Sequence, residues 1–273
     1  MRIGIVIPTY NEAENLPKLI SALFALPLDL SVLIVDDNSP DGTGLLANEL
    51  AASNAGRLSV LHRTKRLGIS SAYVQGFRCA LENNADAVCQ MDADFSHNPA
   101  ILITMAKCLE TYDVVFGSRY ALGGSVDNEW PLWRKGLSAW GNFYARMILR
   151  VPVRDITTGY RLWRAETLRG IPFEKIQSKG FIFQVEMAYL AHCLEYRLHE
   201  TPVYFADRHL GKSKMSLQIQ MEAAFRVWQI WLTHRHLCHI GSAARTRSEL
   251  QSSLLRSCQN PCHGVSKSFS ENP

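Results

Sequence analysis

Hydrophobic residues in the first 118 positions follow two alternating patterns. Short apolar runs predict strands, and segments whose apolar residues return every three or four positions predict helices. The strands are expected at about residues 2–7, 31–36, 57–62, 86–91 and 112–117, and the helices at about 12–25, 42–53, 70–83 and 99–110. Because strands and helices alternate, we expect an α/β fold with a Rossmann-like, mostly parallel sheet flanked by helices.

The strand pattern also indicates where a ligand would bind. Ile3–Ile7 and Val32–Val35 are almost continuously hydrophobic, as expected of strands that are buried on both faces of a sheet. In open parallel sheets, ligands bind beyond the carboxyl ends of the strands. This rule selects three loops: Pro8–Glu12, Asp36–Ser39 and Asp92–Asp94.

Asp92 and Asp94 are the most informative pair in these loops. Two carboxylates one residue apart at the end of a strand can supply hard oxygen ligands to Mg²⁺ or Mn²⁺, and such an ion stabilises a diphosphate leaving group. A solvated turn is the alternative interpretation of an Asp-x-Asp sequence by itself. Acidic residues at three successive strand ends favour the metal interpretation.

The other two loops carry side chains suited to a nucleoside. Pro8 fixes the chain as it leaves the first strand, so that Tyr10 can lie against a base and Glu12 can accept hydrogen bonds from base or ribose. Asp36 and Asp37 end the second strand, where a carboxylate can meet ribose hydroxyl groups. Helix capping is the alternative role for polar residues in these loops, and the candidate caps are Asn11, Ser39 and Asp41.

Two helices are expected in the second half of the chain. One runs from Leu132 to Arg150, and the other is amphipathic and covers about residues 215–235. The apolar stripe of the amphipathic helix consists of Leu217, Met221, Ala224, Phe225, Trp228, Trp231 and Leu232. Such a stripe can lie on a membrane surface with its Trp residues near the headgroups, or it can pack on the core or on a small membrane-anchoring subunit.

The C-terminal part has a different composition. Residues 238–273 are rich in small and polar residues and show little periodicity, so we expect a disordered tail after a single domain of residues 1–237. Three histidines lie near the start of this tail, and we interpret them as a basic helix end rather than a metal site: His234, His236 and His239.

The distribution of charge suggests two kinds of partner. Residues 1–118 carry 8 basic and 13 acidic side chains, whereas residues 119–179 carry 11 basic and 5 acidic side chains. An acidic first half suits a metal ion and a neutral sugar nucleoside, and a cationic second segment suits an anionic acceptor or an anionic membrane surface. A solvated basic face is the alternative, and no nucleic-acid partner is expected.

Length and composition restrict the class of protein further. A chain of 273 residues with 47% hydrophobic residues can form one large α/β domain. No run of about 18 apolar residues occurs, so no transmembrane span is expected. The seven cysteines lack metal-ligand spacing and lie mostly in apolar patterns, which we interpret as reduced core thiols of a cytosolic protein.

Two nucleotide-binding signatures are missing. Gly211-Lys212-Ser213 is similar to the end of a triphosphate-binding loop, but Ala206 stands where that loop needs its first glycine. No G-x-G-x-x-G follows the first strand, which argues against a dinucleotide-dependent dehydrogenase.

Seven motifs in a fixed order make a family resemblance specific. They are Pro8–Glu12, Val35–Thr43, Met91–Pro99, Gly117–Tyr120, Asp155–Arg161, Lys179–Met187 and Asp207–Met215. Over roughly residues 2–235 the chain resembles the family 2 glycosyltransferases of the GT-A fold, and within them the dolichol- or polyprenol-phosphate mannose synthases. The Q-x-x-R-W sequence of processive polysaccharide synthases in that superfamily is absent, which favours transfer of a single sugar.

The resemblance implies roles for individual residues. Those implied to contact the nucleotide-sugar donor are Pro8, Tyr10, Glu12, Val35, Asp37, Asp92, Ala93, Asp94, Arg208 and Lys214. Asp92 and Asp94 would hold its Mg²⁺ or Mn²⁺, together with Ser96, which stands where relatives often carry glutamine, so that water is an alternative third ligand. His97 is the weaker candidate, because these hard metals prefer oxygen.

The resemblance also implies an acceptor and a reaction. Arg119 and Arg134 are expected to bind the phosphate of a dolichyl or undecaprenyl monophosphate, and Asp94, Arg208 and Lys214 are the expected catalytic residues. A phosphate monoester is largely deprotonated near neutral pH, so its oxygen needs positioning more than a general base. The expected activity is inverting transfer of mannose from GDP-mannose at the cytoplasmic face of a membrane. UDP-glucose as donor, and a non-catalytic nucleotide-sugar-binding subunit, are the alternatives.

Overall fold

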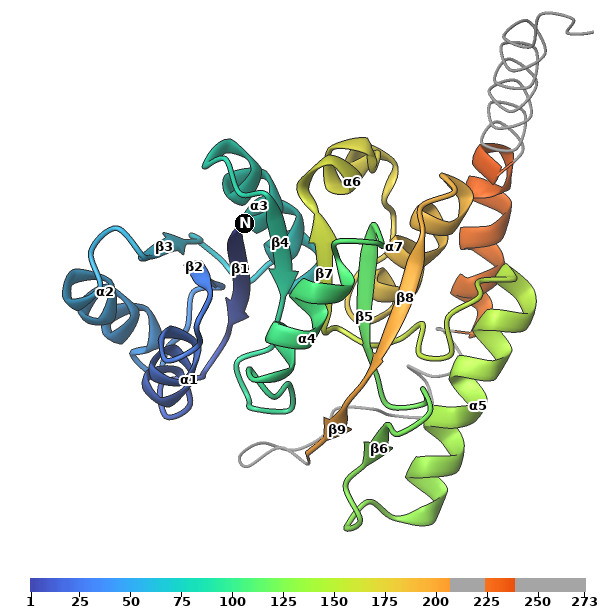
Figure 1. Cartoon of the computed structure of the whole chain (residues 1–273), viewed down its shortest axis with the longest axis horizontal. Coiled ribbons are helices and arrows are strands. Elements are labelled where there is room, and N and C mark those ends of the chain that lie inside the picture. Colours follow the sequence, from blue (N-terminus) through green and yellow to red (C-terminus); the bar gives the residue numbers. More distant parts are fainter. Residues whose placement is uncertain (207–223, 239–273) are drawn as a thin grey trace, which may run out of the picture.

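A seven-stranded sheet forms the centre of the fold in the computed structural model, which describes residues 1–206 and 224–238 (Figure 1). The strand order is β3-β2-β1-β4-β7-β5-β8; β7 is antiparallel to both neighbours, and the other neighbouring pairs are parallel. The strands are β1 Arg2–Thr9, β2 Asp29–Asp36, β3 Leu58–His62, β4 Ala87–Gln90, β5 Val114–Ser118, β7 Arg161–Arg164 and β8 Leu198–Pro202. The short strands β6 (Ser125–Val126) and β9 (Tyr204–Phe205) pair separately. The predicted mostly parallel sheet is confirmed.

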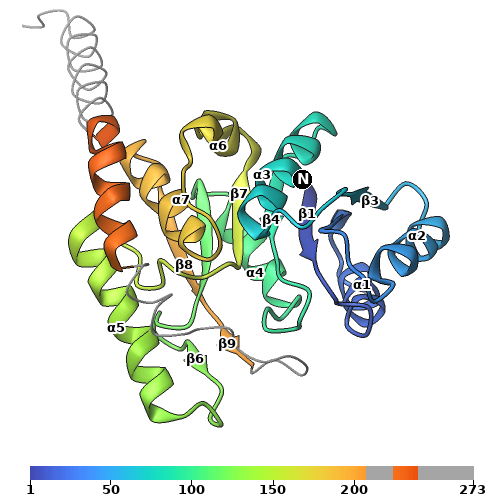
Figure 2. The same ribbon diagram turned by 180° about the vertical axis from the view of Figure 1, so that it is seen from behind.

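Helices cover both faces of this sheet (Figures 1 and 2). One face carries α1 Leu16–Phe24, α2 Thr43–Ser53 and α4 Ile101–Cys108, and the other carries α3 Ile69–Glu82, α6 Ala165–Gly170 and α7 Ile182–Cys193. The 3-10 helix η1 is Phe173–Lys175, and α5 (Leu132–Leu149) packs beside α7 at the β8 side. Successive side chains of a strand point to opposite faces, so Ile5 and Ile7 enter one core layer and Val6 enters the other. This explains why the strand sequences are continuously hydrophobic.

A helix over residues 224–238 lies alongside α5 (Figure 1). The Tyr144 hydroxyl donates to the carbonyl oxygen of Ala224 at 3.1 Å and accepts from the indole N–H of Trp228 at 3.0 Å. Val227 and Ile230 are buried against the core, whereas Phe225, Trp228 and Leu232 of the predicted stripe are exposed. One face of this helix thus packs on the core, and contact of the exposed residues with a membrane or an anchoring subunit stays a prediction. Residues 215–223 and the predicted tail from 239 onward lie outside the described residues.

Two contacts join α7 to this helix, and both correct the sequence interpretation. Cys193 and Cys238 form a disulfide across 45 residues, so not all seven cysteines are reduced thiols. His234 is fully buried and lies 2.7 Å from Glu186 (Nε2 to Oε1), so it is not part of a basic, solvated helix end. Sequence spacing could not reveal either pair, because only the packing of the two helices brings them together.

Among the described helices, none is both long and apolar enough to cross a membrane.

Candidate functional site

Three predicted loops meet at one edge of the sheet, because β2, β1 and β4 are neighbours. The Thr9 hydroxyl donates to Asp36 (Oγ1 to Oδ1, 3.1 Å), and the backbone N–H of Asp37 donates to the carbonyl oxygen of Thr9 (3.0 Å). On the other side of β1, the N–H of Met91 donates to the carbonyl oxygen of Val6 (3.3 Å). The expected meeting of the acidic loops is therefore confirmed.

Asp37 is buried and is used to hold a neighbouring loop. Its Oδ1 accepts from the N–H of Leu67 (2.9 Å) and pairs with Nη1 of Arg63 (2.8 Å), and its Oδ2 accepts from the N–H of Gly68 (2.8 Å). These contacts fix the segment that follows β3. The guanidinium of Arg66 from the same segment lies 3.8 Å from the ring centroid of Tyr10 and covers one face of that ring.

Helix capping explains little of this edge. The cap residues are Asn15 for α1 and Gly42 for α2, and neither makes a side-chain cap hydrogen bond. Ser39 instead accepts a hydrogen bond from the backbone N–H of Asn11 (3.1 Å). The proposed caps Asn11 and Ser39 were therefore wrong, whereas Asp41 does accept from the first-turn N–H of Thr43 (3.0 Å).

The turn from Asp92 to Ser96 is tightly organised. Phe95 has a φ of 59°, a left-handed conformation that is uncommon for a bulky residue, and it turns Ser96 back onto Asp94. Both the N–H (3.1 Å) and the hydroxyl (2.6 Å) of Ser96 donate to Oδ1 of Asp94. Oδ1 of Asp92 accepts from the Tyr73 hydroxyl (2.9 Å), and Nδ1 of His97 accepts from the Asp92 N–H (3.0 Å).

Burial keeps the partners of Asp92 neutral. Burial, reinforced by the negative charge of Asp92, raises the pKa of Tyr73 well above its ordinary value, so the phenol remains a donor. Burial lowers the pKa of His97 despite the nearby carboxylates, which agrees with its Nδ1 acting as an acceptor. His97 is also stacked on Tyr160, with ring centroids 4.9 Å apart. The structure thus gives His97 a supporting contact.

The side chains of this turn fit a hard divalent cation. Asp92, Asp94 and Ser96 offer only oxygen atoms, the ligands that Mg²⁺ and Mn²⁺ prefer. Asp92 makes its hydrogen bonds with neutral groups of the described chain, so its charge is not cancelled there. Within residues 1–206 and 224–238, no group of three or more His, Cys, Asp and Glu side chains is arranged around a metal position.

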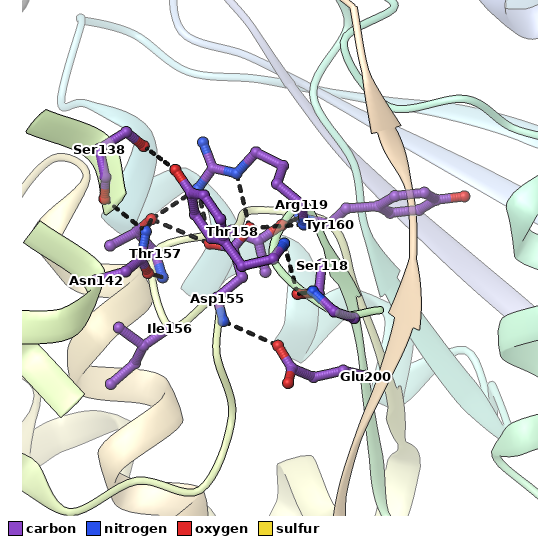
Figure 3. A network of polar contacts seen from close by, with 12 residues as sticks. Ser118, Arg119, Ser138, Asn142, Asp155, Ile156, Thr157, Thr158, Tyr160 and Glu200 are labelled. Atoms are coloured by element: carbon purple, nitrogen blue, oxygen red, sulfur yellow. Dashed lines mark hydrogen bonds and ion pairs between the residues drawn. The ribbon is translucent and has the colours of Figure 1, made fainter. Parts of the chain in front are cut away.

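The Asp155–Arg161 motif comes from a different part of the chain and closes the site. A Cβ atom on Gly159 would lie 3.6 Å from Oδ2 of Asp92, so this loop packs directly against the acidic turn. Asp155 forms a bidentate ion pair with Arg119 at the end of β5, with Nε–Oδ2 and Nη2–Oδ1 distances of 2.7 Å (Figure 3). The positive and negative sequence segments therefore meet at one edge.

The charge state of this pair follows from its surroundings. Burial alone would raise the pKa of Asp155, but the charge and hydrogen bonds of Arg119 outweigh burial and lower it. Burial would likewise lower the pKa of Arg119, and Asp155 raises it instead. Both side chains remain charged at neutral pH.

The remaining predicted site residues differ in their burial and in their position relative to the edge. The side chains of Val35 and Ala93 are buried in the core, and the expected contacts of these two residues with the donor stay a prediction. Pro8 and Glu12 lie partly exposed at the edge. The guanidinium of Arg134 lies in the first turn of α5, 3.7 Å from the ring centroid of Trp130. Arg208 and Lys214 lie outside the described residues.

Sequence reasoning missed the residues that support the acidic turn and Arg119. Tyr73 lies in α3, and Asn142 lies in α5, far along the chain from the loops they contact. The available signal in each helix was a polar residue at a position where helical spacing predicts burial. That signal identifies a contact partner only once the fold is known.

Comparisons with known proteins agree with this arrangement. The family model described as glycosyl transferase family 2 matches residues 4–171. The chain is 44% identical over 235 residues to the undecaprenyl-phosphate mannosyltransferase of Micrococcus luteus, covering 86% of this chain and 96% of that protein. It is 42% identical over 227 residues to the polyprenol monophosphomannose synthase of Mycolicibacterium smegmatis, covering 83% and 85%.

A solved structure supports the fold. Glucosyl-3-phosphoglycerate synthase from Mycobacterium tuberculosis, in complex with Mn²⁺, UDP and phosphoglyceric acid, superposes with a TM-score of 0.59 at 16% identity, covering 86% of this chain and 78% of that chain. The helix-flanked, mostly parallel sheet therefore has the GT-A arrangement. The chain belongs to glycosyl transferase family 2 and is a glycosyltransferase.

Proposed function

We propose that this glycosyltransferase moves mannose from GDP-mannose to a polyprenol monophosphate, dolichyl or undecaprenyl, with inversion at the anomeric carbon. The observation that carries the proposal is the high identity, over more than four fifths of the chain, to two proteins named for mannose transfer to such lipids. An edge that joins acidic loops to the partly exposed Arg119 suits an anionic donor held by a cation and an anionic acceptor.

The donor is assigned to the β1, β2 and β4 loops. Tyr10 would take the base on the ring face that Arg66 leaves open, and Glu12 and Asp37, from the loops that follow β1 and β2, would meet the base or the ribose. Asp92 and Asp94, with Ser96 or water, would hold Mg²⁺ or Mn²⁺. When bound, such an ion neutralises charge on the departing nucleoside diphosphate.

Tyr73→Phe tests the orientation of Asp92. The variant keeps the ring in the core and loses only the hydrogen bond to Oδ1, so we expect apparent Mn²⁺ affinity to fall by about 10-fold to 100-fold with little change in stability. Tyr160→Phe is the matched control, because its hydroxyl donates to the carbonyl oxygen of Asn98 rather than to an aspartate. Metal titration of the transfer rate is the measurement, and equal Mn²⁺ dependence in the two variants would contradict the assignment.

The acceptor is assigned to the opposite side of the edge. Arg119 would position the lipid phosphate, Arg134 at the start of α5 would add a second cation, and Arg208 with Lys214 would stabilise the leaving group. In the proposed step, a phosphate oxygen attacks the anomeric carbon as the bond from that carbon to the nucleoside diphosphate breaks. No proton needs to leave the nucleophile, because the phosphate monoester is already largely ionised.

Action at the cytoplasmic face of a membrane, with or without an anchoring subunit, is the remaining part of the proposal. Two helices that lie side by side (Figure 1) expose large apolar side chains: Leu132, Trp133, Trp140, Phe143 and Met147 from α5, and Phe225, Trp228 and Leu232 from residues 224–238. Basic residues accompany them at Arg134, Lys135, Arg146, Arg150 and Arg235. Exposed Trp residues beside basic groups suit the surface of an anionic bilayer.

A double substitution tests this surface. Trp140→Glu with Trp228→Glu is expected to reduce sedimentation with phosphatidylglycerol vesicles by about tenfold or more, because each change places a charge where an aromatic ring would meet the bilayer. Substitution is preferable to truncation here, since the opposite face of helix 224–238 packs in the core. Leu45→Glu, at an even more exposed apolar site on α2, serves as the control. Undiminished sedimentation of the double variant would reject the surface.

A donor and acceptor panel tests the reaction itself. GDP-mannose and UDP-glucose are each incubated with dolichyl or undecaprenyl phosphate and with Mg²⁺ or Mn²⁺. Mannosyl lipid from GDP-mannose is the expected product. Transfer only from UDP-glucose would show that UDP-glucose, and not GDP-mannose, is the donor. Lack of transfer from every donor would reject the proposed substrates and leave only the family assignment.

A further inference from the structure

We propose that Asp155, Thr157 and Asn142 are positioning residues that aim one amino group of Arg119 at the acceptor phosphate and connect it to α5. This inference rests on the proposed function, because the proposed function identifies the anion that Arg119 binds as a phosphate monoester. None of the three residues was a candidate from the sequence.

Hydrogen bonds to neighbouring side chains hold two of the three guanidinium nitrogen atoms of Arg119 in place (Figure 3). Nε and Nη2 donate to the two oxygens of Asp155, and Nη2 also donates to Oγ1 of Thr157 at 2.8 Å. Its flat surface is flanked by Phe205 and Tyr120, whose ring centroids lie 5.2 and 5.4 Å from Cζ. Nη1 makes no hydrogen bond with any residue in the described part of the chain. Two N–H groups of a fixed fork are thus left for an anion.

Thr157 is the junction of this arrangement. Its hydroxyl oxygen accepts from Nη2 of Arg119 and from Nδ2 of Asn142 (3.1 Å), and its proton is directed to Oδ1 of Asp155 (3.2 Å). The backbone N–H of Thr157 donates to Oδ1 of Asn142 at 3.2 Å. The backbone of the same loop is also held at Ile156, whose carbonyl oxygen accepts a hydrogen bond from Nη2 of the buried Arg161 (2.8 Å).

Asn142 connects this hydrogen-bond network to α5. It is 2% exposed, whereas Trp140 and Phe143 on the same helix are more than half exposed, so α5 directs one polar residue inward and its aromatic residues outward. A second connection joins Tyr120, next to Arg119, to Ser138 of α5 (hydroxyl to hydroxyl, 2.8 Å). The helix proposed to rest on the bilayer is therefore hydrogen-bonded to the loop that orients the arginine.

A buried ion pair of this kind is poorly explained by stability alone. Apolar residues of similar size often replace buried ion pairs without loss of stability, whereas a fixed, planar guanidinium gives bidentate recognition of phosphate. Asp155 orders the arginine while its own negative charge offsets part of the positive potential of the guanidinium. That exchange is useful where direction decides the rate, as it does for an oxygen that must attack in line.

Thr157→Val and Thr157→Ser form the test. Valine keeps the shape and removes the hydroxyl, so we expect the Kd for farnesyl phosphate, a water-soluble short-chain isoprenyl phosphate, and the KM for the lipid acceptor to rise about tenfold, with kcat changed less. Serine keeps the hydroxyl and should restore both values. The Kd for GDP is expected to be equal in all three proteins.

The control is Thr167→Val, which removes a hydroxyl contact to the carbonyl oxygen of Asp113 at the far edge of the sheet. Equal acceptor constants in Thr157→Val and wild type, or the same rise in Thr167→Val, would overturn the inference while the proposed function stands. A wild-type protein that binds farnesyl phosphate but transfers no mannose would fail the proposed function, and the Thr157 pair would still decide the inference. Absence of farnesyl phosphate binding by the wild type would overturn the inference directly.

Discussion

Replacing Asp94 with alanine is expected to lower kcat/KM for sugar transfer by about 10³-fold or more, equivalent to about 4 kcal/mol of transition-state stabilisation. The carboxylate is assigned to the cation that neutralises the leaving diphosphate, and alanine offers no oxygen ligand in its place. The fold should persist, because Asp94 stands on a loop and its hydrogen bonds from Ser96 are local. Transfer rates at increasing Mn²⁺, together with Mn²⁺ binding followed by electron paramagnetic resonance, measure the effect.

Asp86→Asn is the matched control for this change. Asp86 precedes the same strand, β4, but lies at its opposite end, where Oδ2 accepts from the backbone N–H of Arg2 at 2.7 Å. The control should bind Mn²⁺ and transfer sugar as the wild type does. Near-normal turnover of the Asp94 variant at any Mn²⁺ concentration would remove the proposed metal site.

Replacing Glu186 with alanine is expected to lower the free energy of unfolding by about 3 kcal/mol at pH 7. Glu186 accepts from Nε2 of His234 (2.7 Å) and from the N–H groups of Ser178 (2.8 Å) and Gln177 (3.2 Å), so its removal leaves buried donors without an acceptor. Urea unfolding measures the loss. Hydrogen exchange in residues 224–238 should also rise, most clearly after reduction of the Cys193–Cys238 disulfide that holds the same helix.

The pH dependence of this effect has a definite sign. Burial would raise the pKa of Glu186, but hydrogen bonds from His234, Ser178 and Gln177 outweigh it, so the pKa lies below its usual value. A carboxyl with a lowered folded-state pKa stabilises the protein above its unfolded pKa, near 4.3, and loses that contribution as pH falls through the folded value. The difference between wild type and variant should therefore shrink below about pH 4. Exposed Glu174→Ala is the control, and a similar stability loss there would contradict a specific role for Glu186.

Local pattern predicted most of the first half of the fold correctly. The predicted strand 31–36 corresponds to β2 at Asp29–Asp36, and the predicted helix 70–83 corresponds to α3 at Ile69–Glu82. Each is encoded within a few neighbouring residues, by hydrophobic runs or by helical spacing. The first helix was placed too early, because residues before Leu16 form the turn that carries Glu12.

The partners of the predicted residues were not available from local pattern. The resemblance assigned Arg119 to a phosphate, and the structure adds that Asp155, 36 residues later, accepts hydrogen bonds from Nε and Nη2 of its guanidinium. Val35 lies in a motif of the family and still faces the core, since alternate residues of a buried strand point to opposite layers. His234 was interpreted as part of a basic helix end and Cys238 as a reduced thiol, but packing places both against α7.

Short-range hydrophobic patterns and ordered motifs were enough to predict the alternation of strands and helices, the edge where acidic loops gather, and the family. The pairing of charges, the loops held by aspartates and the exposed faces of the helices emerged from the fold, because they depend on contacts between segments tens of residues apart. Those contacts require the sheet order in which β7 lies between β4 and β5.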